Sequence, residues 1–187
     1  MRIPFLLCAV LASSLAFAQV PAKKAAPQPQ QYPDVIFVPT PQEVVDAMLK
    51  IADVKPGDVL YDLGSGDGRI PITAAKRFGV RAVGIDIDPQ RIAEANENAR
   101  RNGVAGQVQF RNENLFTADF REATVVTLYL LPDLNVKLRP RLLAELKPGT
   151  RIVSHQFDMG DWKAEKKLDS LGRTIYFWTI PASRKYR

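Results

Sequence analysis

The residues best suited to chemistry lie between Val59 and Gly68, in the sequence VLYDLGSGDG. A short apolar run ends in the acid Asp62, and glycines follow at every second position, at Gly64, Gly66 and Gly68. Glycine lets the backbone turn sharply and approach a ligand closely, and a helix that begins after such a loop presents free N–H groups. The segment therefore predicts a ligand-binding loop between a strand and a helix.

The spacing of this loop indicates which ligand it suits. A dinucleotide site favours G-x-G-x-x-G, whereas this loop is G-x-G-x-G with an acid before it. Asp62 would repel a phosphate but suits a cationic group. A second acid, Asp86, ends the segment VGID, where nucleotide-binding sheets place a carboxylate on the ribose hydroxyls. We therefore expect a nucleoside whose other end is a zwitterion.

The chain around the loop alternates helical and strand patterns from Thr40 onward, which predicts a parallel α/β sheet. Thr40 is expected to cap the first helix in a capping box, with Pro41 at its first position. Asp88 should cap a later helix, and a leucine repeat predicts another helix that bends at Pro140. Strands are expected over residues 59–63, 82–87, 108–111, 124–130, 151–157 and 174–180.

Composition sets wider limits. The 187 residues, 46% hydrophobic and 25% charged, are typical of one globular domain. A net charge of +6, from 26 Lys+Arg against 20 Asp+Glu, favours acidic partners only weakly because the charges are dispersed. One cysteine and one histidine make a disulfide framework, a thiol nucleophile and a Cys/His metal centre improbable. We expect no metal.

The N-terminus has the pattern of a signal peptide over residues 1–18. Arg2 gives a positive start, an apolar run follows, and Ala16-Phe17-Ala18 is an A-x-A cleavage site. Residues 19–34 form a Pro/Gln/Ala linker that we expect to be disordered, and the domain should span 35–187. The predicted location is therefore outside the cytoplasm, periplasmic or secreted, with an uncleaved N-terminal membrane anchor as the alternative.

The strand followed by DLGSGDG, and then by VGIDIDP, resembles the class I S-adenosylmethionine-dependent methyltransferases over about residues 35–181. The resemblance implies S-adenosyl-L-methionine as cofactor. It also implies an α/β fold with a Rossmann-like, doubly wound seven-strand sheet, in the order 3-2-1-4-5-7-6 with the last strand antiparallel.

The resemblance also assigns cofactor-binding residues. Asp62 and the glycine loop would hold the methionine end, Asp86 the ribose, and Ile87 the adenine, with Asn114 and Leu115 closing over the adenine edge. Many relatives have an acid where Asn114 stands, so the neighbouring Glu113 is an alternative counterpart. The full implied set is Asp62, Gly64, Ser65, Gly66, Gly68, Asp86, Ile87, Asn114 and Leu115.

A narrower resemblance concerns the acceptor. The segments FVPTPQEVVDAML, YDLGSGDGRI, YLLPDLN and SHQF resemble a subfamily of protein-lysine methyltransferases that includes the mitochondrial enzymes for the ATP synthase c-subunit and the ADP/ATP carrier. This implies a protein substrate with a lysine acceptor, in some relatives membrane-associated. The leader peptide departs from that pattern, because those relatives meet cytosolic or mitochondrial cofactor.

Methyl transfer from a sulfonium needs alignment of the acceptor more than a strong base, because the cofactor carries the activation. Tyr129 and Pro132, just after the fourth predicted strand, are our candidates for lining the acceptor channel; a core aromatic is the alternative for Tyr129. His155 is expected to be a structural hydrogen-bonding residue. The arginines at 100, 101, 139 and 141 are expected to face solvent.

Three other functions remain open on the sequence. One is methylation of a small molecule or lipid, which would call for a substrate-capping insertion. Another is a non-catalytic, exported cofactor-binding module. Nucleic-acid methylation is disfavoured, because the string after the fourth strand is YLLPDLN rather than D/N-P-P-Y/F.

Overall fold

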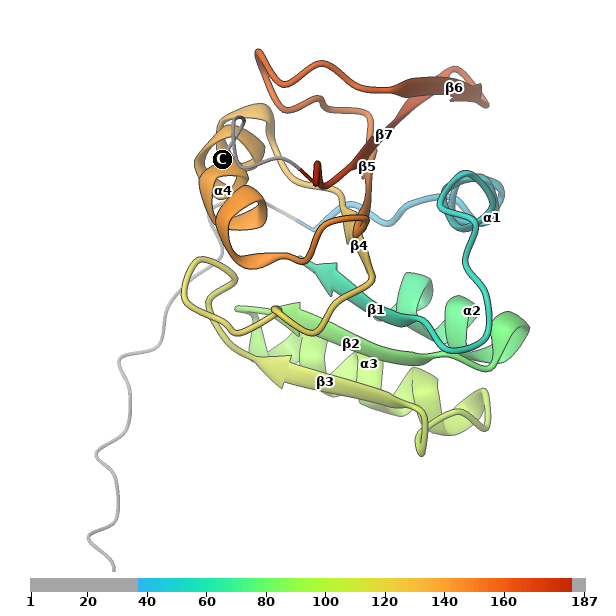
Figure 1. Cartoon of the computed structure of the whole chain (residues 1–187). Coiled ribbons are helices and arrows are strands. Elements are labelled where there is room, and N and C mark those ends of the chain that lie inside the picture. Colours follow the sequence, from blue (N-terminus) through green and yellow to red (C-terminus); the bar gives the residue numbers. More distant parts are fainter. Residues whose placement is uncertain (1–36, 183–187) are drawn as a thin grey trace, which may run out of the picture. The chain divides into compact units, whose positions relative to one another are not determined.

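The computed structural model describes residues 37–182 (Figure 1). The predicted signal peptide and linker, residues 1–34, lie outside the described residues, so both stay predictions. The helices are α1 (Gln42–Ile51), α2 (Arg69–Phe78), α3 (Pro89–Arg101) and α4 (Pro132–Glu145). The strands are β1 (Val59–Leu63), β2 (Arg81–Asp86), β3 (Val108–Asn112), β4 (Val125–Leu128), β5 (Arg151–His155), β6 (Lys166–Ser170) and β7 (Arg173–Thr179).

The strands form one seven-stranded sheet in the order β3-β2-β1-β4-β5-β7-β6. Neighbours from β3 through β5 pair in parallel, whereas β7 runs antiparallel to both β5 and β6. The predicted fold class and strand order are therefore confirmed. In a sheet of this kind the ligand site lies beyond the carboxyl ends of the central strands, here β1, β2 and β4.

Side chains on the two faces of the central strands pack into two separate hydrophobic cores. Leu60, Ala82 and Val125 pack with the inner faces of α1, α2 and α3, while Leu63 and Leu128 pack with α4 on the opposite face (Figure 1). Both faces are covered, which explains why these strands are mostly apolar, apart from residues such as Asp62 and Thr127, and do not alternate with polar residues. Each strand is consequently held in a fixed register, and its carboxyl end is placed firmly.

The start of α1 differs from the prediction. Pro41 is the N-cap residue and no side chain caps the helix, so the expected capping box is wrong. The Thr40 hydroxyl instead forms a 3.1 Å hydrogen bond with Nδ1 of His155, 115 residues away. The Thr40 hydroxyl therefore bonds to a buried tertiary partner, His155, and not to the backbone of the helix that it was expected to cap.

The other helix signals were more reliable. The Asp88 side chain accepts a hydrogen bond from the Gln90 amide, which confirms the predicted cap of α3. Pro140 lies inside α4, as expected for that leucine repeat. The residues of β6 do not predict a strand, because its KKLDS sequence is exposed along the sheet edge and has no apolar periodicity.

Two of the arginines expected to face solvent do not. The Arg139 and Arg141 side chains are only 22% and 25% exposed. Arg141 donates to the carbonyl oxygens of Leu115 and Ala118 and pairs with Glu145, so it ties α4 to the loop after β3. Within residues 37–182, none of the helices is both long enough and apolar enough to span a membrane.

Candidate functional site

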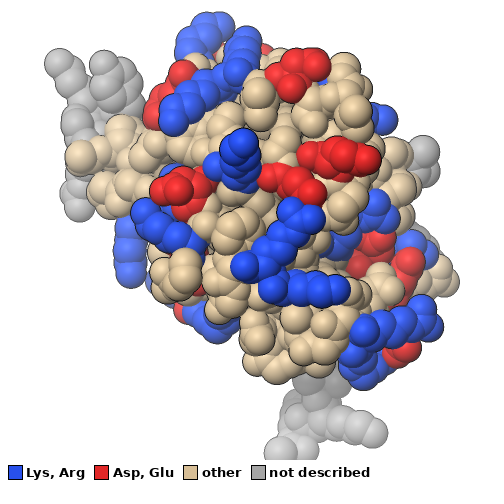
Figure 2. Space-filling view, turned by 90° about the vertical axis from the view of Figure 1, so that its right-hand side faces the viewer, with Lys and Arg blue, Asp and Glu red and all other residues tan. Residues whose placement is uncertain are grey.

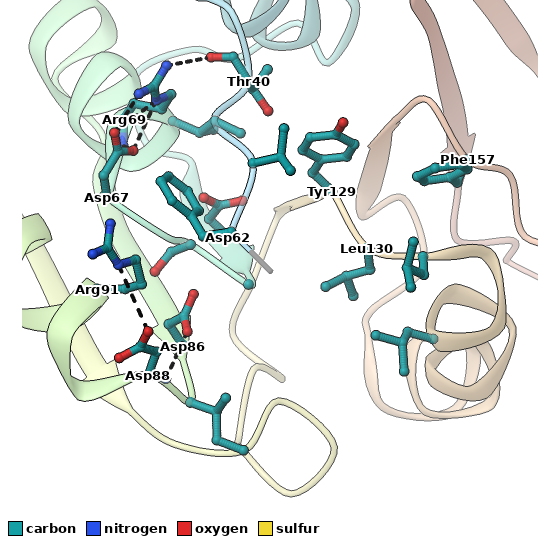
Figure 3. A pocket seen from close by; sticks show the side chains of 18 residues that line it. Thr40, Asp62, Asp67, Arg69, Asp86, Asp88, Arg91, Tyr129, Leu130 and Phe157 are labelled. Atoms are coloured by element: carbon teal, nitrogen blue, oxygen red, sulfur yellow. Dashed lines mark hydrogen bonds and ion pairs between the residues drawn. The ribbon is translucent and has the colours of Figure 1, made fainter. Parts of the chain in front are cut away.

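A cavity of about 440 Å³ opens at the carboxyl ends of β1, β2 and β4, where the topology predicts a ligand. Its two sides differ in chemistry, as Figure 3 shows: Asp62, Asp67, Asp86 and Asp88 lie on one side, and Tyr129, Leu130 and Phe157 on the other. The cavity is therefore suited to a ligand with a cationic and hydroxyl-bearing body that meets an apolar channel.

Asp62 is the most unusual group of the acidic side. It is only 2% exposed, and its Oδ1 accepts a 2.7 Å hydrogen bond from the Thr127 hydroxyl. The pKa of Asp62 is raised to about 8 as the net result of burial, which raises it most, the Thr127 hydrogen bond, which lowers it, and the charges of Asp86 and Asp67, which raise it. The described residues give this carboxylate too little compensation, so a cationic ligand group would stabilise it.

The glycine loop is shaped by close contacts as well as by its turn. At Gly68, φ is +79°, and a Cβ there would lie 2.4 Å from the ring of Phe110 and 2.9 Å from Ala95. At Gly66, a Cβ would lie 2.1 Å from the ring of Phe37. Only glycine permits both this backbone conformation and this packing, which is why the predicted loop carries glycines here.

Asp86 closes the loop from the next strand. Its Oδ2 accepts a 2.8 Å hydrogen bond from the Gly66 amide, and its Oδ1 accepts one from the Asp88 amide at 2.9 Å. A carboxylate has about four acceptor positions, so lone pairs remain for two ligand hydroxyls. Ile87 also lines the cavity and offers an apolar contact for a base.

A short segment before α1 crosses the same cavity. Arg69 pairs with Asp67 and donates a 2.8 Å hydrogen bond to the carbonyl oxygen of Thr40. The Arg91 guanidinium lies 5.2 Å from the centre of the Phe37 ring. These contacts hold residues 37–40 against the glycine loop. Phe37 and Thr40 both line the cavity.

The apolar side is built from the ends of β4 and β5. The Tyr129 ring lies 3.9 Å from the His155 ring and 6.3 Å from the Phe157 ring, measured between centroids. His155 is fully buried, and burial, with a smaller effect of Arg173, lowers the pKa of its imidazole to about 4. His155 is thus a neutral support behind Tyr129, which agrees with the structural role expected from the sequence.

Six of the predicted site residues line the cavity: Asp62, Gly64, Ser65, Asp86, Ile87 and Tyr129. Gly66 and Gly68 instead shape the loop behind it, as described above. Asn114 and Leu115 are not among the lining residues; Asn114 caps its own turn by accepting from the Phe116 amide. Pro132 is exposed and also outside the lining, whereas its neighbours Leu131 and Leu134 belong to it.

Sequence reasoning overlooked several lining residues, among them Phe37, Thr40, Arg69 and Phe157. These residues belong to the segments FVPTP, DGRI and SHQF, which resemble the lysine methyltransferases, and that resemblance could have pointed to them. No local rule indicates that the three segments meet at one cavity. Among residues 37–182, no group of three or more His, Cys, Asp or Glu side chains is arranged to hold a metal ion.

The residues present fit S-adenosylmethionine. Asp62 is a buried carboxylate with no cationic partner among residues 37–182, and it suits the amino group of the methionine end. Asp86 suits the ribose diol, and Ile87 the adenine. The loop residues Gly64 and Ser65 line the cavity directly, so the loop backbone lies next to the ligand space. When bound, this cofactor supplies a methyl group already activated by a sulfonium.

Comparisons with known proteins agree with this geometry. The model of the ANTKMT methyltransferase domain matches residues 62–166. A protein-lysine N-methyltransferase from Saccharolobus islandicus (strain REY15A) is 48% identical over 153 residues, covering 79% of this chain and 95% of that protein. The lysine N-methyltransferase for the ATP synthase c-subunit of Rattus norvegicus is 30% identical over 148 residues, covering 79% of this chain and 68% of the relative.

A solved structure is similar over the same region. The crystal structure of an RNA methyltransferase from Salinibacter ruber in complex with S-adenosyl-L-homocysteine has a TM-score of 0.77 and 59% sequence identity, and covers 78% of this chain and 95% of that one. The fold, the cofactor-shaped cavity and these similarities lead to one conclusion. The chain belongs to the family of the ANTKMT methyltransferase domain and is an S-adenosylmethionine-dependent methyltransferase.

Proposed function

We propose that this enzyme transfers methyl groups to lysine side chains of a protein. The similar proteins from Saccharolobus islandicus and Rattus norvegicus are both named as lysine N-methyltransferases. The observation that carries the proposal is the character of the channel side of the cavity. Tyr129, Leu130, Leu131 and Phe157 line it, and none of these side chains is an acid or an imidazole.

A channel of this kind suits an amine acceptor. A lysine must lose its proton before its nitrogen can attack, and an apolar, water-poor channel next to a cationic centre lowers its pKa. The four carboxylates of the cavity lie on the opposite side, and His155 is buried behind Tyr129 with a pKa of about 4. Removal of water by the channel walls therefore replaces a general base.

Methylation of RNA is the second candidate, because the similar protein from Salinibacter ruber is named as an RNA methyltransferase. The surface supports it less well. On the face that Figure 2 shows, lysines and arginines are interspersed with Asp and Glu rather than gathered in one stripe. Several of these basic side chains are paired, such as Arg77 with Asp46 and Arg81 with Glu122. A nucleic-acid site normally presents a continuous basic surface.

A small-molecule or lipid acceptor would call for a substrate-capping insertion, and residues 37–182 contain none longer than a loop. Between Phe37 and Ala182, the longest connection between neighbouring elements is the segment of residues 113–124 that follows β3.

We also propose that the enzyme is exported, on the pattern of residues 1–18. Detection of a mature N-terminus at Gln19 in a periplasmic or culture fraction would support export, and an intact Met1 in the cytosol would contradict it.

The test uses the full chain with methyl-labelled S-adenosylmethionine and, separately, membrane proteins, periplasmic proteins, cytosolic proteins and total RNA. Asp62→Asn, which keeps the size of the side chain without its charge, serves as the control. Label recovered as methyl-lysine from a discrete protein band, and lost with the control, is the expected result. Label in RNA alone would replace the proposal with the second candidate, and no label in protein would refute it.

A further inference from the structure

We propose that Phe157 is the second aromatic wall of the acceptor channel, and that Asn135 is the positioning residue that holds Phe157 in place. The inference rests on the proposed lysine chemistry and deepens it. It concerns the last residues of two of the resembling segments, Phe157 of SHQF and Asn135 of YLLPDLN.

Phe157 and Tyr129 face one cavity from neighbouring strands. Tyr129 follows β4 and Phe157 follows β5, two strands paired in parallel. Their rings are tilted by only 20° relative to each other, with centroids 6.3 Å apart, and both side chains are half-buried (Figure 3). Two such rings present apolar faces to an acceptor, and aromatic faces also attract an ammonium group.

A strained turn delivers Phe157 to this position. Gln156 has a φ of +69°, which is unusual for a residue with a side chain. The Phe157 amide donates a 2.9 Å hydrogen bond to the carbonyl oxygen of His155, two residues earlier, so the chain reverses direction directly after β5. Strained backbone persists only where surrounding contacts impose it, and it concentrates at functional sites.

Asn135 supplies those contacts from the side of α4. It is fully buried, and its Nδ2 lies 3.3 Å from the carbonyl oxygen of Phe157, 3.2 Å from that of Asp158 and 3.2 Å from the Ser154 hydroxyl. Its Oδ1 is buried and has no hydrogen-bond partner among the described residues. Packing alone would favour a leucine here, as at Leu138 one turn later, so the amide serves the carbonyl groups of the turn.

The test measures binding and turnover separately on the full chain. S-adenosylhomocysteine affinity is measured by calorimetry, and kcat and KM are measured with poly-L-lysine as acceptor. The variants are Phe157→Leu, Asn135→Ala, Asn135→Leu and the double variant Phe157→Leu/Asn135→Ala. Leu142→Ala, a buried change further along α4, is the control for lost stability.

A second readout does not require activity. The enzyme is labelled with ring-¹³C phenylalanine and loaded with S-adenosylhomocysteine, and n-butylammonium, the lysine side chain without its backbone, is titrated in. The Phe157 signal is identified by its loss in Phe157→Leu. It should shift with n-butylammonium in the unaltered enzyme, and should lose that response in Asn135→Ala and Asn135→Leu.

In turnover, each single change at Phe157 or Asn135 should lower kcat/KM by about tenfold or more while cofactor affinity stays within about twofold. Because Asn135 acts through Phe157, the double variant should be about as impaired as Phe157→Leu alone. The inference would be overturned if the losses of kcat/KM from Phe157→Leu and Asn135→Ala added up in the double variant, or if Leu142→Ala caused an equal loss. It would also be overturned if n-butylammonium did not shift the Phe157 signal of the unaltered enzyme. If the unaltered enzyme binds S-adenosylhomocysteine but methylates no lysine, the proposed function is refuted instead. In that case the response of the Phe157 signal to n-butylammonium still decides whether Phe157 is a wall of an amine channel.

Discussion

The Thr127 hydroxyl donates a hydrogen bond to the carboxylate of Asp62 across two paired strands, with 2.7 Å between the oxygens. The two residues are 65 positions apart in the chain and directly opposite in the register of β1 and β4. This bond is the main protein interaction that lowers the pKa of Asp62, against the burial that raises it to about 8. The charge state of the cofactor site therefore depends on this pair.

The first prediction concerns cofactor affinity and pH. Asp62 must be ionised to bind a cationic amino group, so below a pKa of about 8 binding has to remove a proton from it. Affinity for S-adenosylhomocysteine should then rise about tenfold between pH 6 and pH 7 and level off above pH 8. Calorimetry across this range measures the effect. Asp62→Asn should bind weakly with little pH dependence; a steep profile in that variant would assign the titration to another group.

The second prediction concerns Thr127. Thr127→Val removes the hydroxyl that lowers the pKa of Asp62 and keeps the β-branched shape of the buried residue. The pKa of Asp62 should rise, so the whole affinity profile should move to higher pH, with the greatest loss of affinity near pH 7. Thr127→Ser, which keeps the hydroxyl, is the matched control. Equal profiles for the valine and serine variants would show that the hydrogen bond has no influence on the site.

The third prediction separates two reasons for glycine. Gly68→Ala should suffer both the strain of a positive φ and a collision with Phe110 and Ala95, whereas Gly79→Ala at φ +66° has nothing within 4 Å of the new Cβ. The strain alone is worth about 1–2 kcal/mol and overpacking adds roughly 1–3 kcal/mol. Urea denaturation should therefore show a clearly larger loss of unfolding free energy for Gly68→Ala. Equal losses of unfolding free energy in the two variants would mean that the residues around Gly68 shift to accommodate the new Cβ.

The fourth prediction concerns His155 and the stability of the domain. Burial lowers the pKa of His155 from 6.5 to about 4, so between these values the unfolded chain binds the proton that the folded protein excludes. This contribution to stability is complete above pH 6.5 and is lost as pH falls towards 4; it amounts to roughly 3 kcal/mol. The difference in unfolding free energy between the unaltered protein and His155→Asn, measured from pH 4 to 7, should follow this course. A difference independent of pH would contradict it.

The fifth prediction concerns the channel. Tyr129→Phe and Leu131→Ala change groups that line the cavity on the side away from the carboxylates. Each should lower turnover of a lysine acceptor by about tenfold while S-adenosylhomocysteine affinity changes little, because the acceptor must be aligned and freed of water at these walls. Steady-state kinetics and calorimetry on the same preparations measure the two effects. Equal losses in both would place these residues in the cofactor half.

The sequence alone determined the glycine loop, the two acids at the carboxyl ends of β1 and β2, the cap at Asp88 and the helix–strand alternation. Each depends on local rules: positive φ requires glycine, an N-cap requires a short polar side chain, and a strand covered on both faces is apolar throughout. The resemblance then supplied the order of the strands and the cofactor.

Only the tertiary structure decided how distant groups meet. Thr40 carries the signal of a helix cap, yet its hydroxyl bonds to His155 because the fold brings that buried ring beside it. Phe157 belongs to the cavity because a turn at Gln156, held by Asn135 from α4, directs it there. Such contacts join residues that are 22 to 115 positions apart. They follow from strand register and helix packing, and neither propensity nor spacing along the chain encodes them.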